Sequence, residues 1–128
     1  MEKKRILFVD DEEALLRMFK RVLEQKGGYE VAVEQNAKLA LQKARDFKPQ
    51  IIFIDIMMPE MEGSALAFEI RSDPALAQVP IVFLTGAVSA QELARTGGEI
   101  GGQFFLAKPV DIKQLMDCIE ERLGPRGV

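Results

Sequence analysis

Five short apolar runs, each followed by a segment with helical spacing, constrain the fold of this chain more than any other feature. The runs are rich in β-branched and aromatic residues and cover 6–9, 31–33, 51–54, 81–84 and 104–106. Four of them are almost continuously apolar, which is typical of strands covered on both faces of a sheet. The second run is flanked by Glu30 and Glu34, which favours a strand at the edge of the sheet.

The segments between the runs place apolar residues on one face of a helix. Helices are predicted at about 15–23, from about 37 to near Pro49, at about 64–72, from about 89 onward, and at 112–123. Gly27 and Gly28 end the first helix, and Asp111 is a plausible N-cap of the last. A glycine pair at 97–98 interrupts the fourth helix, and a second pair at 101–102 follows it.

Strand–helix alternation repeated five times predicts a doubly wound α/β fold, with a parallel sheet covered by helices on both faces. Right-handed crossovers leave few topologies for such a chain. With the second strand at an edge, a flavodoxin-like sheet of five strands in the order 2-1-3-4-5 fits best. We expect residues 1–123 to form one domain and residues 124–128 to be a tail or the start of a linker.

The composition excludes several kinds of chemistry. There is one cysteine, Cys118, and no histidine, which rules out an intramolecular disulfide, a Cys/His zinc site and Ser-His or Cys-His catalysis. A formal charge of -3 is too small to indicate binding to nucleic acid or to a membrane by bulk electrostatics. No apolar run approaches the ~20 residues needed to span a bilayer, and the charged start contains no signal peptide. A cytoplasmic location is expected.

Polar residues follow the predicted strands at the end of the sheet where ligands bind in open α/β folds. Asp10 and Asp11 follow the first strand, and Asp55 ends the third. Thr85 ends the fourth strand, and Lys108 comes shortly after the fifth. Each has an ordinary structural interpretation when taken alone, such as a helix cap or a solvated loop charge. Their common position at one edge favours a functional site.

Three carboxylates close together repel one another unless a cation lies among them. A hard divalent ion with oxygen ligands resolves this conflict, and Mg²⁺ suits a site with few carboxylates. With Asp55 beside the metal and with Lys108 and Thr85 opposite, the site would cradle a phosphoryl group in transfer. Aspartate is moreover a nucleophile in aspartyl-phosphate formation.

The segments 9–11, 55–63, 84–87 and 108–109, which read VDD, DIMMPEMEG, LTGA and KP, occur in this order on the expected elements. They closely resemble the motifs of the receiver domain of two-component response regulators, and the resemblance spans the chain from Ile6 to Leu123. It implies a phosphoacceptor signalling domain that catalyses only its own phosphoryl transfer and slow autodephosphorylation.

The resemblance also implies a role for each residue of the site. Asp55 would accept the phosphoryl group from a sensor histidine kinase or a histidine phosphotransfer protein. Mg²⁺ would be bound by Asp11, Asp55 and the backbone carbonyl of Met57, with Asp10 helping through water. Lys108 would contact the phosphoryl oxygens, and its bond to the following proline would be cis.

For signalling, the resemblance implies that Thr85 and Phe105 move together and change the surface of the last helices and strand. The downstream effector or output domain that reads this surface is unknown from the sequence. Met57 and Ala87 would flank the path of the water that hydrolyses the phosphoryl group. Neither side chain orients or deprotonates that water.

Three alternative functions were weighed. A haloacid-dehalogenase-type phosphatase needs Asp-x-Asp after its first strand, whereas this chain has Asp10-Asp11-Glu12. A flavodoxin-type flavin module needs a phosphate loop rich in hydroxyls and glycine, and the acidic segment 10–13 would repel phosphate. A receiver-like interaction module that never gains phosphate lacks a reason for the complete acceptor set, and a phosphorylation assay decides this alternative.

Overall fold

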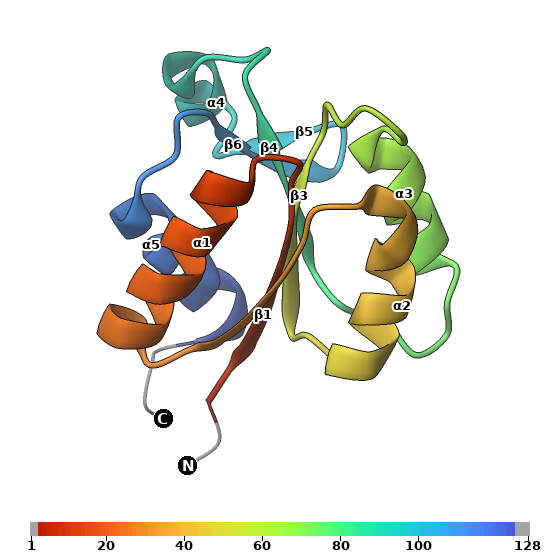
Figure 1. The fold of residues 1–128 in the computed structure, drawn as a ribbon. Coiled ribbons are helices and arrows are strands. Elements are labelled where there is room, and N and C mark those ends of the chain that lie inside the picture. The colour runs from red at the N-terminus through yellow and green to blue at the C-terminus, as the bar shows by residue number, and fades with distance from the viewer. Residues whose placement is uncertain (1–2, 125–128) are drawn as a thin grey trace.

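The computed structural model describes residues 3–124 and contains the five predicted parallel strands in the predicted order (Figure 1). These strands are β1 (Arg5–Val9), β2 (Glu30–Glu34), β3 (Ile51–Asp55), β4 (Ile81–Thr85) and β6 (Gln103–Ala107). The full sheet has the order β2-β1-β3-β4-β6-β5, with β2 at one edge as the sequence predicted. The doubly wound, flavodoxin-like fold is therefore confirmed. Residues 125–128 of the predicted tail lie outside the described part of the chain.

The prediction of a five-stranded sheet was wrong by one short strand. A two-residue strand, β5 (Glu99–Ile100), pairs antiparallel with the start of β6 at the far edge of the sheet. Gly101 and Gly102 form the turn between them with φ values of 59° and 80°. Glycine adopts this left-handed conformation without the steric penalty of other residues, so the glycine pair makes a tight hairpin possible.

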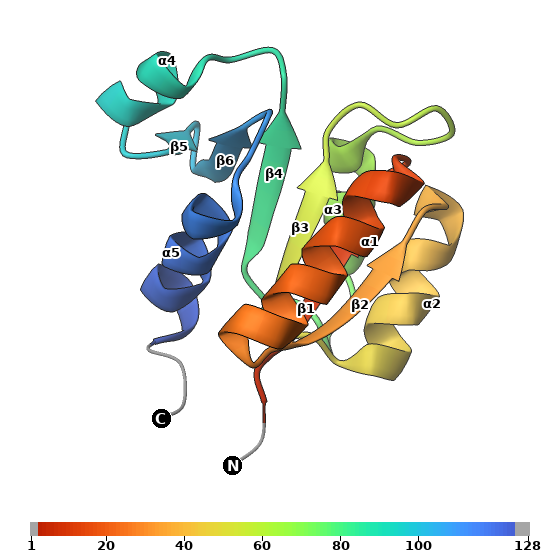
Figure 2. The same ribbon diagram turned by 60° about the vertical axis from the view of Figure 1, so that its left-hand side comes forward.

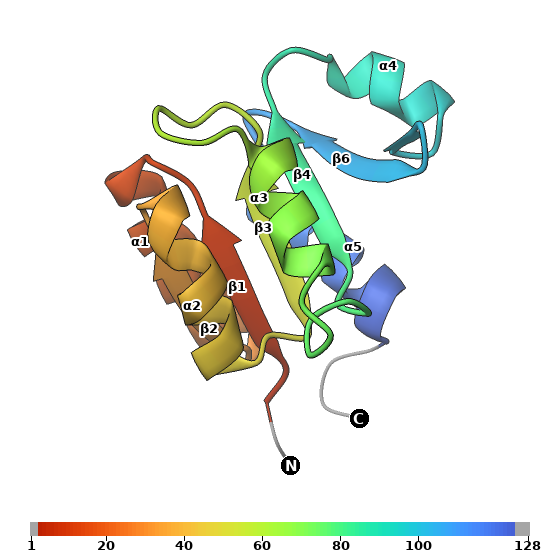
Figure 3. The ribbon, with the colours of Figure 1, turned by 90° about the vertical axis from the view of Figure 1, so that its right-hand side faces the viewer.

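Helices cover both faces of the sheet. They are α1 (Glu13–Val22), which continues as a π-helical turn η1 (Leu23–Gly27), α2 (Ala37–Phe47), α3 (Gly63–Arg71), α4 (Ala90–Arg95) and α5 (Ile112–Leu123). Figure 2 shows α1 and α5 on one face, and Figure 3 shows α2 and α3 on the other. The short helix α4 lies beside β5 and β6, away from the β2 edge. No helix within residues 3–124 is long and apolar enough to cross a membrane.

The helix ends follow the local sequence. Gly28, at φ 67°, terminates the π-helical turn after α1, in agreement with the predicted glycine stop. Asp111 caps α5 in a reciprocal capping box with Gln114, as predicted for its N-cap. Helix α4 has only six residues, and Gly97 and Gly98 beyond it have φ values of 69° and 83°. The glycine pair thus ends α4 after fewer than two turns.

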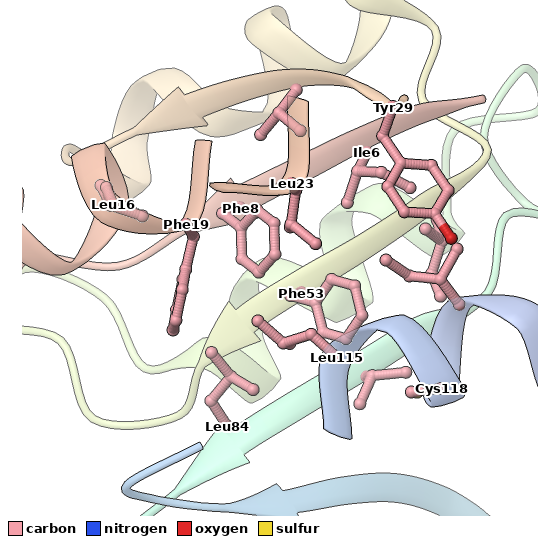
Figure 4. Close-up of a cluster of buried hydrophobic side chains, with 14 residues drawn as sticks. Ile6, Phe8, Leu16, Phe19, Leu23, Tyr29, Phe53, Leu84, Leu115 and Cys118 are labelled. Carbon is pink, nitrogen blue, oxygen red and sulfur yellow. The ribbon is translucent and has the colours of Figure 1, made fainter. Parts of the chain in front are cut away.

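Two apolar clusters fill the layers on the two sides of the sheet. In the layer under α1 and α5, Phe8 stacks on Phe53 with ring centroids 4.8 Å apart and lies 5.2 Å from Phe19 (Figure 4). Cys118 lies in the same layer and is buried, as its helical position predicted. Leu16 of α1 belongs to the same cluster and is only 1% exposed. This packing fixes the strands whose ends carry the polar residues.

Candidate functional site

Asp10 follows the last residue of β1 and is almost completely buried, with 1% of its surface exposed. Its Oδ1 accepts a hydrogen bond from the backbone N–H of Glu12 at 3.0 Å. Its buried Oδ2 forms an ion pair with the Lys108 ammonium, whose Nζ lies 3.1 Å away. A buried carboxylate is costly unless it is paired, so the burial of Asp10 requires a cation at this end of the sheet.

Asp55 is the last residue of β3 and is 4% exposed. The backbone N–H of Met57 donates to its Oδ1 at 3.3 Å. Asp11, by contrast, is exposed on the loop after β1. The structure nevertheless brings carboxylate oxygens of Asp10, Asp11 and Asp55 within 4.8 Å of one another. The three acids predicted to meet at the carboxyl end of the sheet therefore do so.

Lys108 supplies the positive charge at this end of the sheet. Its Nζ lies 3.1 Å from Asp10 Oδ2 and 3.3 Å from Asp55 Oδ2. Lys108 directly follows β6. Its backbone N–H donates to the Thr85 carbonyl of β4 at 2.7 Å, which holds Lys108 beside the end of that strand. The bond between Lys108 and Pro109 is cis, as the resemblance implied.

Burial and charge set the protonation of the cluster. Burial raises the pKa of Asp10 to about 6, and repulsion from Asp55 adds to the increase, while hydrogen bonds from Glu12 and Lys108 oppose it. Burial also disfavours the charged form of Lys108, but Asp10 and Asp55 outweigh it and raise the pKa of this ammonium. Asp10 and Lys108 are therefore both shifted toward their protonated forms, as expected for a buried carboxyl near another acid and for an ammonium held between carboxylates.

The residues present fit a divalent metal ion. The three aspartates offer oxygen ligands at mutual distances that one ion can bridge, and hard cations such as Mg²⁺ prefer oxygen ligands. The buried Asp10 Oδ2 has the Lys108 ammonium as its polar partner, and it would still be able to accept a hydrogen bond from a metal-bound water. An added positive charge would also relieve the repulsion between Asp10 and Asp55, which adds to the effect of burial on the pKa of Asp10.

Thr85 and Phe105 lie on neighbouring strands near this cluster. Thr85 is 3% exposed, and its Oγ1 accepts the N–H of Ala87 at 3.0 Å. Phe105 lies one pleat back from the strand end, because Thr85 pairs in register with Ala107. The half-buried Phe105 ring lies 5.5 Å from that of Phe83. Met57 extends into solvent, with 73% of its surface exposed.

Sequence reasoning missed two residues that touch the site. The Oε1 of Glu12 lies 3.5 Å from Lys108 Nζ, and Gly63 packs on the backbone of Asp55. Glu12 could have been found from its position directly after the acidic pair. Nothing in the sequence pattern shows which backbone Gly63 approaches, because that contact depends on how the loop between β3 and α3 folds back.

Two surface hollows flank the acids. One of about 280 Å³ lies on the Lys108 side and is lined by Glu12, Leu15, Leu84, Lys108, Pro109 and Val110. The other, also about 280 Å³, lies on the Asp11 side and is lined by Asp11, Gln35, Asn36, Ala37, Met58, Pro59 and Glu60. Of the three acids, Asp11 lines one of these hollows, whereas Asp10 and Asp55 line neither.

Comparisons with known proteins agree with this geometry. The chain matches the response regulator receiver domain family over residues 6–120. It is 31% identical over 121 residues to chemotaxis protein CheY of Bacillus subtilis, covering 94% of this chain and 98% of that protein. The crystal structure of chemotaxis protein CheY4 of Vibrio cholerae is similar, with a TM-score of 0.80 and 28% identity over 95% of this chain and all of that one.

Longer proteins also contain a matching segment. The nisin biosynthesis regulatory protein NisR of Lactococcus lactis is 34% identical over 120 residues, which is 93% of this chain but 50% of NisR. The chain spans 9% of histidine kinase P4 of Formosa agariphila. The family match, the order of the strands in the sheet and the acids at the strand ends all indicate the same family. The chain belongs to the response regulator receiver domain family, the phosphoacceptor domains of two-component signalling.

Proposed function

We propose that Asp55 is the phosphoacceptor of this domain. The observation that carries the proposal is its position: a carboxylate at the end of a central strand, 4% exposed, with an ammonium 3.3 Å from its Oδ2. Two further aspartates lie within metal-sharing distance of it. A buried carboxylate is costly unless it has such partners, so its placement here needs a chemical explanation.

In the proposed reaction, a carboxylate oxygen of Asp55 attacks the phosphorus of a phosphohistidine. An O–P bond forms, the N–P bond breaks, and the histidine nitrogen leaves with the bonding electron pair. Lys108 would contact the phosphoryl oxygens once the group is on Asp55, because its ammonium lies beside Asp55 and can donate hydrogen bonds to them. Fixed positive charge at the developing phosphoryl oxygens is the main contribution that a protein makes to this reaction.

A Mg²⁺ ion held by Asp11, Asp55 and the Met57 carbonyl, with Asp10 acting through water, would neutralise charge on the phosphoryl group in transfer. The protein's own contribution is to keep these oxygens together and to hold Asp55 and Lys108 within reach of each other. The N–H of Met57 fixes the orientation of the Asp55 carboxylate. We also assign slow autodephosphorylation to the domain, with no reaction on a separate substrate.

The proposed partners are a sensor histidine kinase or a histidine phosphotransfer protein upstream, and an effector or output domain downstream. Thr85 and Phe105 would relay the phosphorylated state to the surface formed by α4, β6 and α5. Residues 1–123 would form the receiver, with 124–128 as a tail or the start of a linker, in the cytoplasm. The formal charge of -3 gives no support for direct nucleic-acid binding by this domain.

Incubation of the purified chain with Mg²⁺ and acetyl phosphate or a phosphorylated histidine donor tests this function. We expect intact-mass spectrometry to show the addition of one phosphoryl group, lost in alkali or hydroxylamine as an acyl phosphate is. Asp55→Asn should abolish the addition and leave the circular dichroism spectrum intact. EDTA should suppress it in the native protein.

Asp46→Asn is the matched control, because Asp46 is an exposed acid on α2 whose Oδ1 accepts a hydrogen bond from Gln42. This variant should take up phosphate at the native rate. Phosphate uptake that persists in Asp55→Asn would contradict the assignment of the acceptor. A native chain that takes up no phosphate from any donor would instead favour the interaction module without phosphoryl transfer.

A further inference from the structure

Glu12 contacts two residues of the acidic site, Asp10 through its backbone and Lys108 through its side chain. Its backbone N–H donates to Asp10 Oδ1 at 3.0 Å, and its carboxylate lies 3.5 Å from Lys108 Nζ. Although Glu12 is the N-cap residue of α1, its side chain makes no capping hydrogen bond. The carboxylate is 62% exposed. Its side chain is thus available to Lys108 rather than to the helix.

Lys108 contacts three carboxylates, and two of them belong to the candidate metal cluster. Asp10 Oδ2 and Asp55 Oδ2 lie 3.1 Å and 3.3 Å from its Nζ, and these residues also supply oxygens to the metal cluster. A divalent cation and an ammonium repel each other strongly at such short range. When the cation binds, the ammonium must therefore move away from Asp10 and Asp55.

Glu12 is the third partner and lies outside the metal cluster of Asp10, Asp11 and Asp55. Its exposed position at the rim lets its carboxylate follow the flexible lysine without leaving water. We propose that Glu12 is a positioning residue for Lys108, which takes the ammonium when a divalent cation occupies the three aspartates. Glu12 thereby favours cation binding and holds the ammonium at the rim of the site, within reach of a phosphoryl group on Asp55. The second consequence rests on the proposed phosphoacceptor function.

Magnesium affinity of the metal-free protein, measured by isothermal titration calorimetry, tests the proposal without any phosphoryl transfer. Glu12→Gln should weaken Mg²⁺ binding by about two- to fivefold, the range expected for one exposed ion pair. Glu13→Gln removes the same charge from the neighbouring position, where the carboxylate pairs with Arg17 on α1 and not with Lys108. This control should change the affinity by less than about 1.5-fold, because solvent and salt screen its charge.

A double-mutant cycle separates the route through Lys108 from direct attraction between Glu12 and the metal. Lys108→Gln removes the competing ammonium and should tighten Mg²⁺ binding by about tenfold or more. In the Lys108→Gln background, Glu12→Gln should change the Mg²⁺ affinity no more than Glu13→Gln does. If the role of Glu12 were purely structural, metal-free Glu12→Gln would melt at a lower temperature than the native protein. We expect its melting temperature to be unchanged.

Equal effects of Glu12→Gln and Glu13→Gln in the native background would overturn the proposal, because only general charge would then matter. The proposal would also be overturned if Glu12→Gln still weakened Mg²⁺ binding more than Glu13→Gln does in the Lys108→Gln background. Mg²⁺ binding that does not tighten on Lys108→Gln would overturn it as well. A chain that meets all these expectations but takes up no phosphate would contradict the proposed function alone and leave the role of Glu12 intact.

Discussion

Gly63, the first residue of α3, packs directly on the backbone of Asp55. A Cβ atom at this position would lie 2.6 Å from the Asp55 carbonyl oxygen and 2.9 Å from the Cα of Ile56. The Gly63 N–H donates to the Ile56 carbonyl at 2.9 Å, which closes the loop between β3 and α3. Only glycine allows so close an approach, so this residue positions the strand end that carries the candidate phosphoacceptor.

Gly63→Ala should therefore displace the end of β3, because both nearest atoms belong to the backbone and not to a flexible side chain. We expect the free energy of unfolding to fall by about 1–3 kcal/mol, as for overpacked interiors. Phosphate uptake should slow as well, since the Asp55 carboxylate moves with its backbone. Urea denaturation followed by circular dichroism measures the first effect, because the chain has no tryptophan.

Gly86→Ala is the control for this prediction, since a Cβ at Gly86 meets no atom within 4 Å. Gly86 follows Thr85 directly, so the control also lies beside the site. It should change the free energy of unfolding by no more than about 0.5 kcal/mol, as at exposed positions generally. If Gly63→Ala were as harmless as Gly86→Ala, the close approach would have no energetic consequence.

The fold was predictable because its signals are local and repeated. Continuous apolar runs such as 51–54 indicate buried parallel strands, and the charged flanks of β2 indicated its edge position, which the sheet order confirms. Parallel strands end at one edge, so the convergence of Asp55, Thr85 and Lys108 followed from topology alone.

The remaining features depend on contacts that carry no periodic signal. The two-residue strand β5 is too short to show an alternating pattern, and the glycine pair of its turn appears in the sequence only as a second pair after the interrupted fourth helix. The contact between Glu12 and Lys108 joins two loops far apart in the sequence. Its existence depends on side-chain reach across the end of the sheet, which neither propensity nor spacing encodes.

The buried carboxylate of Asp10 should make the stability of the metal-free protein fall with rising pH. Its pKa in the folded protein is about 6, against an ordinary value of 3.8. Between these values the folded state binds more protons than the unfolded state, so the free energy of unfolding decreases as pH rises from about 4 to about 6. The decrease should reach up to about 3 kcal/mol, and denaturation in EDTA across this range measures it.

Asp10→Asn should remove that pH dependence and make the metal-free protein more stable than the native chain at pH 8. The asparagine oxygen can still accept the Glu12 N–H, and Lys108 keeps Asp55 and Glu12 as partners. Added Mg²⁺ should stabilise the native protein more than the variant, because the variant has lost one carboxylate. A pH profile of Asp10→Asn that parallels the native one would show that another group causes the fall.

Phosphorylation, or its beryllofluoride mimic, should change the surface built from α4, β6 and α5. For Thr85 to move toward Asp55, its Oγ1 must give up the Ala87 N–H that it accepts at 3.0 Å. The loop that leads into α4 would be released with it, and the neighbouring ring of Phe105 could then turn inward. Backbone NMR shifts should therefore extend from Asp55 to α4 and to the strand β6.

Thr85→Ala tests whether this threonine carries the effect. The variant should still bind beryllofluoride, because Asp55 and the metal-binding aspartates are intact, but the shifts in α4 and β6 should be lost. Asp46→Asn on the opposite layer should keep the full native pattern. The proposed relay from Asp55 to α4 and β6 would be contradicted if the NMR shifts of the native protein were confined to the immediate surroundings of Asp55. It would also be contradicted if the shifts in α4 and β6 persisted in Thr85→Ala.

The last prediction is that the phosphoryl group on Asp55 is long-lived for a receiver domain. Hydrolysis needs a water held in line with the phosphorus, and positioning is much of what a protein contributes to phosphoryl transfer. Met57, two residues after Asp55, is 73% exposed and presents a thioether, while Ala87 presents a methyl group. Neither side chain binds a water strongly or removes its proton, so the domain suits a relay or a slow response.

Met57→Asn and Ala87→Glu would place polar groups beside that path and should shorten the lifetime in Mg²⁺ by about three- to tenfold. This is a small part of the effect of a well-placed general base, because both positions are exposed. Met57→Leu keeps the bulk without the sulfur and should leave the lifetime unchanged, whereas Met57→Ala tests whether bulk shields the phosphorus. Loss of label from the purified phosphorylated protein measures each rate. If Met57→Asn and Ala87→Glu left the lifetime unchanged while Met57→Ala shortened it, shielding by the methionine would control hydrolysis instead of the absence of a group that positions water.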